Sequence, residues 1–295
     1  MFRLFTVTII WAFSFSLIGH FLAGSVDPYI SILLRFLIAS FVLLPFFDFS
    51  LLRKKISLHY IFIGMVQIGL MYIFYYKSFE FLSVPLVALL TITTPLYVQL
   101  ISDLFFVKFS KQSLFALGAS LIGAIFLKWA PLNQLEVRGI ILIQLANICF
   151  ATGQVLYKFF QINKRKEIPP LQSFFLFYVG AIIPIIPLVI LKSDMSKLPH
   201  TMTHFVVILW LGVMASAVGY YLWNSGSLKV HQTQLAVMNN AVIPCAILVN
   251  FVIWKKLIQW QTFLIGTTLI ALSILISHKI QRQYQSLKMK GKDHL

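Results

Sequence analysis

The sequence predicts an all-α polytopic membrane protein, and three observations lead to that fold class. Of the 295 residues, 59% are apolar and only 11% are charged, whereas charged residues make up about a quarter of an ordinary soluble domain. Apolar runs of roughly 20 residues, the length that crosses a bilayer core as a helix, recur along the chain. Short polar connections, many of them basic, separate these runs. The composition excludes a soluble enzyme, a disordered chain and a fibrous repeat.

Ten apolar segments fit transmembrane helices. They span residues 4–22, 29–48, 58–77, 82–103, 112–129, 138–158, 171–191, 205–223, 233–254 and 260–279. The first segment is longer than the apolar region of a signal peptide, which has about 7–15 residues. It also carries Trp11 and Ser14, an unusual choice for a disposable segment. We therefore expect it to stay in the mature protein as a helix.

Positive charge predicts that both termini are cytoplasmic. With the N-terminus inside, 16 of the 24 Lys and Arg residues fall in the inner loops and the C-terminal tail, and 7 fall in the outer loops. This is the bias of cytoplasmic loops that lie beside an anionic leaflet. The clusters account for the net charge of +16 and leave no basic domain for nucleic acid.

The chain shows signs of internal duplication. Tyr72, Ser78 and Pro95 recur as Tyr221, Ser227 and Pro244, each at a spacing of 149 residues. Five helices per half is an odd number, so the second half would enter the membrane upside down, as in many secondary transporters. We predict two inverted five-helix repeats, residues 1–130 and 131–280, and a basic cytoplasmic tail, 281–295.

Pro95 and Pro244 lie inside the fourth and ninth segments. A proline removes one helical hydrogen bond and kinks the helix. Interrupted helices at equivalent places in two halves point to a central binding site. We predict that the two prolines act as hinges beside such a site; a role in packing alone is the alternative.

Polar residues recur at helical spacing within three later segments. They are Gln144, Asn147 and Gln154 in the sixth segment, Tyr220 and Asn224 in the eighth, and Asn239 and Asn240 in the ninth. Carboxamides are costly to expose to lipid, so they either bond across helices or line a cavity. Three such sets predict a wet central cavity that binds a small-molecule substrate.

Aromatic residues accompany these polar sets. Trp11, Tyr72, Tyr97 and Trp223 each offer a flat apolar face and a hydrogen-bonding tip, and we predict that they line the cavity together with Ser14. For Tyr97 and the two tryptophans, a place in the aromatic belt at the membrane interface is the alternative.

Arg35 is the clearest charge inside a predicted span. A charge there is by default a sign of function, and its planar guanidinium suits a substrate carboxylate. It could instead extend outward to the interface, or pair with Asp27 or Glu80. We predict that Arg35 contacts substrate.

Catalytic and metal-binding patterns are absent from the sequence. There is no phosphate-binding loop and no HExxH motif, and His200 and His204 lack a third ligand. We therefore predict no catalytic residue, no metal and no cofactor. Small residues spaced four apart in segment 112–129 suit close packing, either between the halves or between two protomers, so a homodimer is possible.

Several stretches carry a resemblance to a known family. They are residues 11–17 (WAFSFSL), Leu22-Ala23-Gly24 with Val26-Asp27, Arg35, Pro95-Leu96-Tyr97, Met238-Asn239-Asn240, and Val249-Asn250 with Trp254. The chain resembles the EamA-like drug/metabolite transporters, and among them the carboxylate/amino acid/amine branch that includes bacterial inner-membrane carriers of biotin. An arginine in the second helix is common across the superfamily and says little about substrate.

The resemblance implies a secondary active transporter in a bacterial inner membrane, working by alternating access. Biotin uptake is the expected activity, because aromatic walls, amide groups and one arginine suit its apolar bicycle, ureido group and carboxylate. The same residues would suit S-adenosylmethionine, an amino acid or an amine, moved by uptake, exchange or export. A membrane protein that transports nothing is the alternative from another class.

Overall fold

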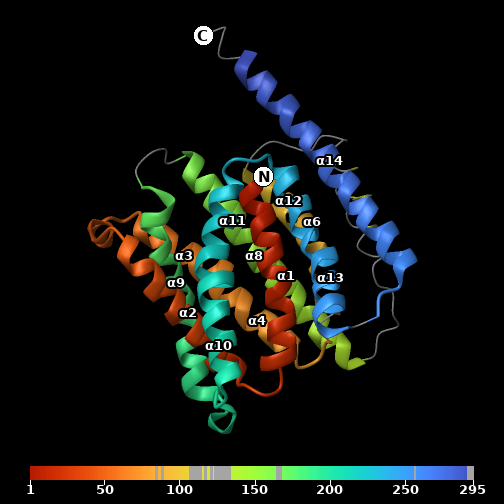
Figure 1. The fold of residues 1–295 in the computed structure, drawn as a ribbon. Coiled ribbons are helices and arrows are strands. Elements are labelled where there is room, and N and C mark those ends of the chain that lie inside the picture. Colours follow the sequence, from red (N-terminus) through yellow and green to blue (C-terminus); the bar gives the residue numbers. More distant parts are fainter. Residues whose placement is uncertain are drawn as a thin grey trace.

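Apolar helices dominate the computed structural model of the chain (Figure 1). The structure describes residues 1–83, 86–87, 90–105, 115, 118–119, 122, 134–163, 168–255 and 257–290, of which 134–136, 163 and 280–290 are described by their backbone alone. Eight helical segments in these ranges are long and apolar enough to cross a membrane. They correspond to the first three and the last five of the ten predicted segments.

The first half of the described chain contains three of these spans. α1 (Phe2–Leu17) continues as a π-helical segment, η1 (Ile18–Leu22), and α2 covers Pro28–Leu43. Two short 3-10 turns, η2 (Leu44–Phe46) and η3 (Phe49–Arg53), lead to the third span, which is built from α3 (Ser57–Gly64), the π-helical η4 (Met65–Leu70) and α4 (Met71–Ser78). A 3-10 turn, η5 (Thr91–Thr93), then precedes α6 (Thr94–Phe105).

The second half supplies the other five spans. α8 covers Gln134–Asn163 and α9 covers Pro170–Lys192; after the 3-10 turn η6 (Met195–Lys197), α10 (Met202–Trp210), the π-helical η7 (Leu211–Val218) and α11 (Gly219–Ser227) form one span. α12 (Gln232–Asn240) and α13 (Val242–Trp254) form the next span, and α14 covers Trp260–Lys290. The helix of α14 thus continues into the predicted tail.

Two predicted segments are not described along their whole length. The described part of segment 82–103 contains α6, whereas residues 84, 85, 88 and 89 lie outside the described residues. Segment 112–129 lies outside them except at four positions, and so does most of its small-residue face. Ten helices and the dimer contact therefore remain predictions.

The irregular parts of the helices recur along the chain. The π-helical η4 in the third span has its counterpart in η7 of the eighth segment. The turn of Thr91–Thr93 before α6 has its counterpart at Ala241, which separates α12 from α13. Pro95 follows the turn of Thr91–Thr93, and Pro244 follows Ala241, each within four residues. The middle residue of that turn and Ala241 are 149 residues apart, the same spacing that relates the two prolines.

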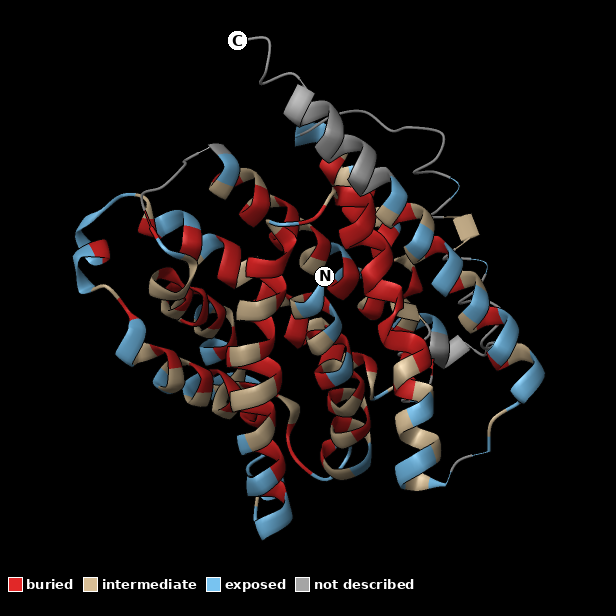
Figure 2. Ribbon diagram, turned by 45° about the horizontal axis from the view of Figure 1, so that its top comes forward, coloured by how far each residue is buried: buried red, intermediate tan, exposed pale blue. Residues whose placement is uncertain are grey.

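Buried side chains gather where the helices face one another, and the outward faces are exposed (Figure 2). Large apolar side chains stand on these outward faces, among them Phe41, Ile190 and Phe205. Such a surface suits hydrocarbon and not water. The beginning of α1 and the end of α14 lie at the same end of the bundle, which we call the terminal end (Figure 1).

Close helix contacts depend on glycine. A Cβ atom added to Gly64 of α3 would collide with the backbone of Phe177 in α9, and one added to Gly180 of α9 would collide with the backbone of Ile61 in α3. Because glycine has no side chain, the two backbones come into direct contact. This contact fixes α3 and α9 as one wall of the bundle.

Asp27 joins two loops at the end of the bundle opposite the terminal end. Its carboxylate accepts hydrogen bonds from the N–H groups of Tyr29 and Ile30, at 2.9 and 3.0 Å, and so caps α2. The second carboxylate oxygen accepts from the N–H of Asp194 at 2.9 Å, and the Asp27 N–H donates to the Lys197 carbonyl at 2.9 Å. The loop before α2 is therefore bound to the loop between α9 and α10.

Candidate functional site

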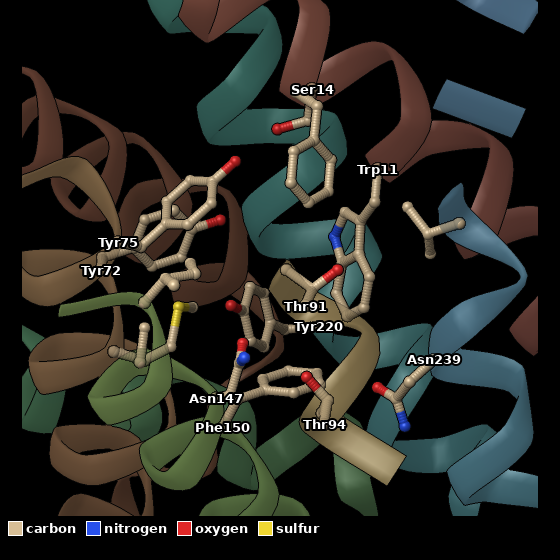
Figure 3. Close-up of a pocket in the computed structure, with 15 residues that line it drawn as sticks. Trp11, Ser14, Tyr72, Tyr75, Thr91, Thr94, Asn147, Phe150, Tyr220 and Asn239 are labelled. Carbon is tan, nitrogen blue, oxygen red and sulfur yellow. The ribbon is translucent and has the colours of Figure 1, made fainter. Parts of the chain in front are cut away.

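A cavity lies between helices from both halves of the chain. It has an empty volume of about 670 Å³, which includes open solvent at its mouth. Its lining residues are Trp11, Ser14, Phe15, Met71, Tyr72, Tyr75, Thr91, Thr94, Ile143, Ala146, Asn147, Phe150, Tyr220, Asn239 and Val242. Figure 3 shows these side chains arranged around a common space.

Trp11 is at the centre of one aromatic wall. Its ring centroid lies 5.6 Å from that of Phe150, 5.3 Å from that of Tyr220 and 4.9 Å from that of Trp223. Its indole N–H donates to the Ala215 carbonyl at 3.0 Å, which fixes the ring against η7. A ring held in this way offers a rigid, flat apolar surface to a ligand.

Tyr72 and Tyr75 of α4 form a second aromatic wall. The ring of Tyr75 meets that of Phe15 edge to face at 5.6 Å, and the ring of Tyr72 lies 6.1 Å from that of Tyr220. Figure 3 places Tyr72 and Tyr75 across the space from Trp11 and Asn239. The cavity is thus bounded by aromatic rings from α1, α4, α8 and α11.

Amide and hydroxyl groups complete the lining beside the interruption at η5. The side-chain N–H₂ of Asn147 donates to the Leu90 carbonyl at 2.9 Å and to the Thr93 hydroxyl at 3.1 Å. The amide oxygen of Gln144 accepts from the hydroxyls of Thr93, at 2.5 Å, and Tyr97, at 3.1 Å. Gln144 and Tyr97 therefore attach the irregular segment to α8, and Asn147 reaches the cavity.

Arg35 lies behind this lining and is fully buried. One guanidinium nitrogen donates to the Tyr76 hydroxyl at 2.8 Å, and the other donates to the Tyr72 hydroxyl at 2.8 Å and to the Ser216 hydroxyl at 3.1 Å. The central carbon of the guanidinium lies 4.5 Å from the centroid of the Tyr72 ring, a cation–π contact. Since Tyr72 also lines the cavity, it links the charge to the cavity.

The expected alternatives for Arg35 are wrong. Asp27 caps α2 instead, and Glu80 forms an ion pair with Lys77 at 2.8 Å. Complete burial also excludes a side chain that extends outward to the interface. The physical reason is local, because the hydroxyls of Tyr72 and Tyr76 come from adjacent turns of α4 and reach the guanidinium together.

The structure brings six of the thirteen predicted binding residues into the cavity lining. These six are Trp11, Ser14, Tyr72, Asn147, Tyr220 and Asn239. The other seven are not lining residues: Arg35, Tyr97, Gln144, Gln154, Trp223, Asn224 and Asn240. Five of those seven are buried, whereas Tyr97 and Gln144 are half-buried.

Several of these buried residues bond across helices. The Trp223 indole N–H donates to the Gln154 amide oxygen at 2.8 Å, which joins α11 to α8. The Gln67 side chain donates to the Asn224 amide oxygen at 3.2 Å, which joins η4 to α11. Buried carboxamides were expected either to line a cavity or to bond between helices. Gln154 and Asn224 bond between helices.

The predicted hinges lie next to the lining. Pro95 follows the lining residue Thr94, and Pro244 lies two residues after the lining residue Val242. Both prolines are buried. The sequence placed them inside the helices, but each lies in the first turn of a helix, α6 or α13, directly after an interruption of the span. A proline is tolerated there because its missing N–H has no partner within the helix.

Nine lining residues were not predicted from the sequence as site residues. They are Phe15, Met71, Tyr75, Thr91, Thr94, Ile143, Ala146, Phe150 and Val242. A usable signal exists for Ile143 and Phe150, which lie one turn before and one turn after Asn147 on α8. Thr91, Thr94 and Val242 could have been found from their closeness to the two prolines.

The described residues contain no group of three or more His, Cys, Asp or Glu side chains that could hold a metal ion. Cys149 and Cys245 are both free thiols. The lining residues include Asn, Ser, Thr and Tyr but neither Asp nor Glu. The cavity therefore offers neutral hydrogen-bonding groups and aromatic surface, with a buried guanidinium close behind.

Comparison with known families decides the class of the protein. The model of the EamA-like transporter family matches residues 1–129 and, a second time, residues 137–278. The chain belongs to the EamA-like transporter family. It is therefore an all-helical, multi-pass membrane transporter and not an enzyme, which confirms the family resemblance of the sequence and contradicts a membrane protein that transports nothing.

Proteins from bacteria resemble the chain over nearly its whole length. A "Probable biotin transporter" of Pseudomonas aeruginosa is 35% identical over 280 residues, which are 95% of this chain and 98% of that protein. A "Biotin transporter" of Escherichia coli K12 is also 35% identical, over 94% of this chain and 92% of that protein. A solved crystal structure with 16% identity matches with a TM-score of 0.77 over 96% of this chain and 97% of that one, and it supports the fold alone.

Proposed function

We propose that this EamA-like transporter is a secondary carrier that takes up biotin across the bacterial inner membrane. The observation that carries the proposal is the central cavity, walled by aromatic rings, with Arg35 bonded to the lining residue Tyr72. Bacterial relatives that are 35% identical over nearly the whole chain bear the name biotin transporter. Both lines of support favour a ligand with an apolar body and a negative charge.

Each part of biotin has a matching surface in the cavity. The bicycle and the aliphatic tail suit the rings of Trp11 and Tyr75. The NH₂ groups of Asn147 and Asn239 donate within the protein, so their amide oxygens are the groups that can accept from the ureido N–H groups. The carboxylate suits the side of the cavity where Tyr72 connects to Arg35.

Charge favours biotin over a cationic substrate. Burying a charge without a counter-ion costs several kcal/mol, and the described partners of Arg35 are hydroxyl groups. A carboxylate in the cavity would offset that cost, whereas the sulfonium of S-adenosylmethionine or a simple amine would add a second positive charge. Neither Glu80 nor Asp103 is a lining residue that could receive such a cation.

Alternating access is the proposed mechanism. In this arrangement the repeats 1–130 and 131–280, of five helices each, lie inverted around the cavity, and both termini are cytoplasmic. The paired interruptions of the helices support it, because η5 and Ala241 lie beside lining residues from different halves. Bending at Pro95 and Pro244 would let one half move against the other while the cavity stays between them.

Uptake of labelled biotin tests the proposal. The chain is expressed in bacterial cells that neither make nor import biotin, and initial uptake is measured with and without excess unlabelled biotin, S-adenosylmethionine or single amino acids. We expect saturable uptake that only biotin suppresses. The proposal for biotin would be wrong if no uptake is seen and if S-adenosylmethionine or an amino acid, but not biotin, raises the unfolding temperature of the purified protein. The compound that stabilises the protein would then be the proposed substrate.

A further inference from the structure

Lys158 is a second buried cation that the central cavity does not use. It lies near the end of α8, its side chain is 5% exposed, and its ammonium group donates to the Val230 carbonyl at 2.5 Å. Asn147, Gln154 and Lys158 follow one another at helical spacing, so they share one face of α8. At 1.5 Å per residue, Lys158 lies about 16 Å along the axis from Asn147, toward the terminal end (Figure 1).

Hydrogen-bond donors accumulate around Lys158. The amide oxygen of Gln154 accepts from Trp223, so the NH₂ group is the remaining part of that amide; this buried nitrogen has no hydrogen-bond partner. Gln232, which is 8% exposed, has no hydrogen-bond partner for its amide nitrogen or its amide oxygen. Gln154 lies one turn before Lys158 on α8, and Gln232 lies two residues after Val230, whose carbonyl accepts from the lysine. Both amides with unused donors therefore belong to segments that meet at Lys158.

The start of α12 adds to this positive environment. The hydrogen bond from Lys158 to the Val230 carbonyl holds the ammonium group two residues before the first residue of α12, Gln232. The N-terminal turn of a helix presents N–H groups and partial positive charge. Burial and the Lys158 ammonium also lower the pKa of His231, the residue before α12.

An aromatic plug separates this cluster from the central cavity. We use that name for Trp11, Phe150 and Trp223, whose ring centroids are 4.9 Å (Trp11 to Trp223), 5.6 Å (Trp11 to Phe150) and 6.2 Å (Phe150 to Trp223) apart. Trp11 and Phe150 line the cavity, and Trp223 is bound to Gln154, one turn before Lys158. A ligand that moves from the cavity toward the terminal end along α8 therefore meets the plug and then Lys158.

We propose that Lys158 and Gln154 form a second anion-binding site, which the substrate carboxylate occupies after it passes the aromatic plug. This site rests on the proposed function, because it requires an anionic substrate that crosses the bundle. Arg35 on the cavity side and Lys158 on the terminal side then stabilise the carboxylate in turn, so that the anion is not left without a partner in the apolar interior. In this role the carboxylate displaces the Val230 carbonyl from the ammonium group.

The proposal separates binding from movement. Lys158→Met removes the charge and keeps the length of the side chain, whereas Lys158→Arg keeps the charge. Gln154→Glu keeps an acceptor for Trp223 and places a negative charge beside the lysine. Lys229→Met is the matched control, because Lys229 is exposed and close in sequence to Val230. Each full-length variant is purified, its thermal unfolding is measured, and it is reconstituted into liposomes.

Two measurements are made with labelled biotin: equilibrium binding to the purified protein and the initial rate of uptake into liposomes. We expect Lys158→Met and Gln154→Glu to lower the uptake rate about tenfold or more while binding changes less than about twofold, since the central site is intact. Lys158→Arg should keep most of the uptake, and Lys229→Met should match the wild type. Should Lys158→Met fail to fold, Gln154→Glu carries the test.

Four outcomes would overturn the site. Wild-type uptake by Lys158→Met, or equal losses in Lys158→Met and Lys158→Arg, would show that the positive charge is not what matters. Losses of binding as large as the losses of uptake would place the effect in the central cavity. If the wild type itself moves no biotin, the proposed function fails first and the second site fails with it.

Discussion

A guanidinium nitrogen of Arg35 lies 2.8 Å from the hydroxyl oxygen of Tyr72, a residue that also lines the central cavity. The phenol therefore forms the described contact between a buried positive charge and the space where a ligand would sit. Because the Tyr72 hydroxyl accepts a hydrogen bond from the Arg35 cation, its own O–H is polarised and becomes a stronger donor. This relationship leads directly to a prediction about substrate charge.

Tyr72→Phe should weaken biotin binding, because it removes the hydroxyl group between Arg35 and the cavity and leaves the ring in place. We expect a loss of about tenfold or more, because a hydrogen bond to a charged group contributes about 1.5–3 kcal/mol. Tyr76→Phe is the matched control, since Tyr76 also bonds to Arg35 but is not a lining residue. Equilibrium binding of labelled biotin measures both; equal effects of the two variants would argue against a special role of Tyr72.

Asn239→Ala and Asn240→Ala should behave differently although the residues are adjacent. Asn239 lines the cavity and Asn240 does not, so only the first variant should lower affinity for substrate, by about tenfold for a lost amide contact. Asn240 is fully buried, and its replacement should instead lower the unfolding temperature. The same binding assay and a thermal unfolding scan separate the two; the reverse pattern would mean that the other face of α12 meets substrate.

Trp11→Ala should reduce binding more than Trp11→Phe. The indole ring lines the cavity and packs against Tyr220 and Trp223, so complete truncation removes apolar contact and loosens the wall, whereas phenylalanine keeps much of the contact. We expect the alanine variant to bind about tenfold or more weakly. Trp254→Ala provides the control, because Trp254 stacks on His20 and is not a lining residue. Similar losses in both would indicate a general packing defect.

Acid should destabilise the protein through His231. Its side-chain nitrogen accepts from the Thr233 N–H and caps α12, and burial, together with Lys158, lowers its pKa below the usual value near 6.5. A His whose pKa is lowered on folding contributes stability that is present above the unfolded pKa, and that stability is lost as the pH falls through the folded pKa. The unfolding temperature should therefore drop below about pH 6.5.

His231→Asn should reduce this acid sensitivity, because asparagine can cap a helix without binding a proton. Thermal unfolding at pH 7.5 and pH 5.5 would be compared for the wild type, for His231→Asn and for His200→Asn, whose exposed side chain lies in another loop. The drop in unfolding temperature should shrink in the first variant and persist in the second. An unchanged drop in both would assign the acid response to other groups.

The sequence was sufficient to predict the eight spans that the structure describes and insufficient to predict their irregular parts. Apolar runs of about 20 residues mark helices without regard to packing, so eight segments appear in the described chain close to their predicted places. The π-helical segments η4 and η7 have no such signal, because they contain ordinary helix-forming residues. The prolines did indicate the irregularities near Thr93 and Ala241, since a missing N–H group is visible in the sequence.

The candidate site was predicted only in part, for a physical reason that α8 illustrates. Gln144, Asn147 and Gln154 share one face of that helix, yet only Asn147 lines the cavity. Gln144 and Gln154 bond to residues of α6 and α11, respectively. A carboxamide that faces a cavity and one that bonds to a neighbouring helix have the same spacing, and only the partner distinguishes them. Apolar lining residues such as Ile143 give no contrast within an apolar segment.

The link through Asp27 limits how the bundle can open. Two hydrogen bonds of 2.9 Å bind the loop before α2 to the loop between α9 and α10. If these bonds persist during a transport cycle, α2, α9 and α10 move together as one rigid body. The cavity must then open at that end of the bundle between other helices. The stacked rings of His20 and Trp254 join η1 to α13, and this contact is then the one that breaks when the bundle opens.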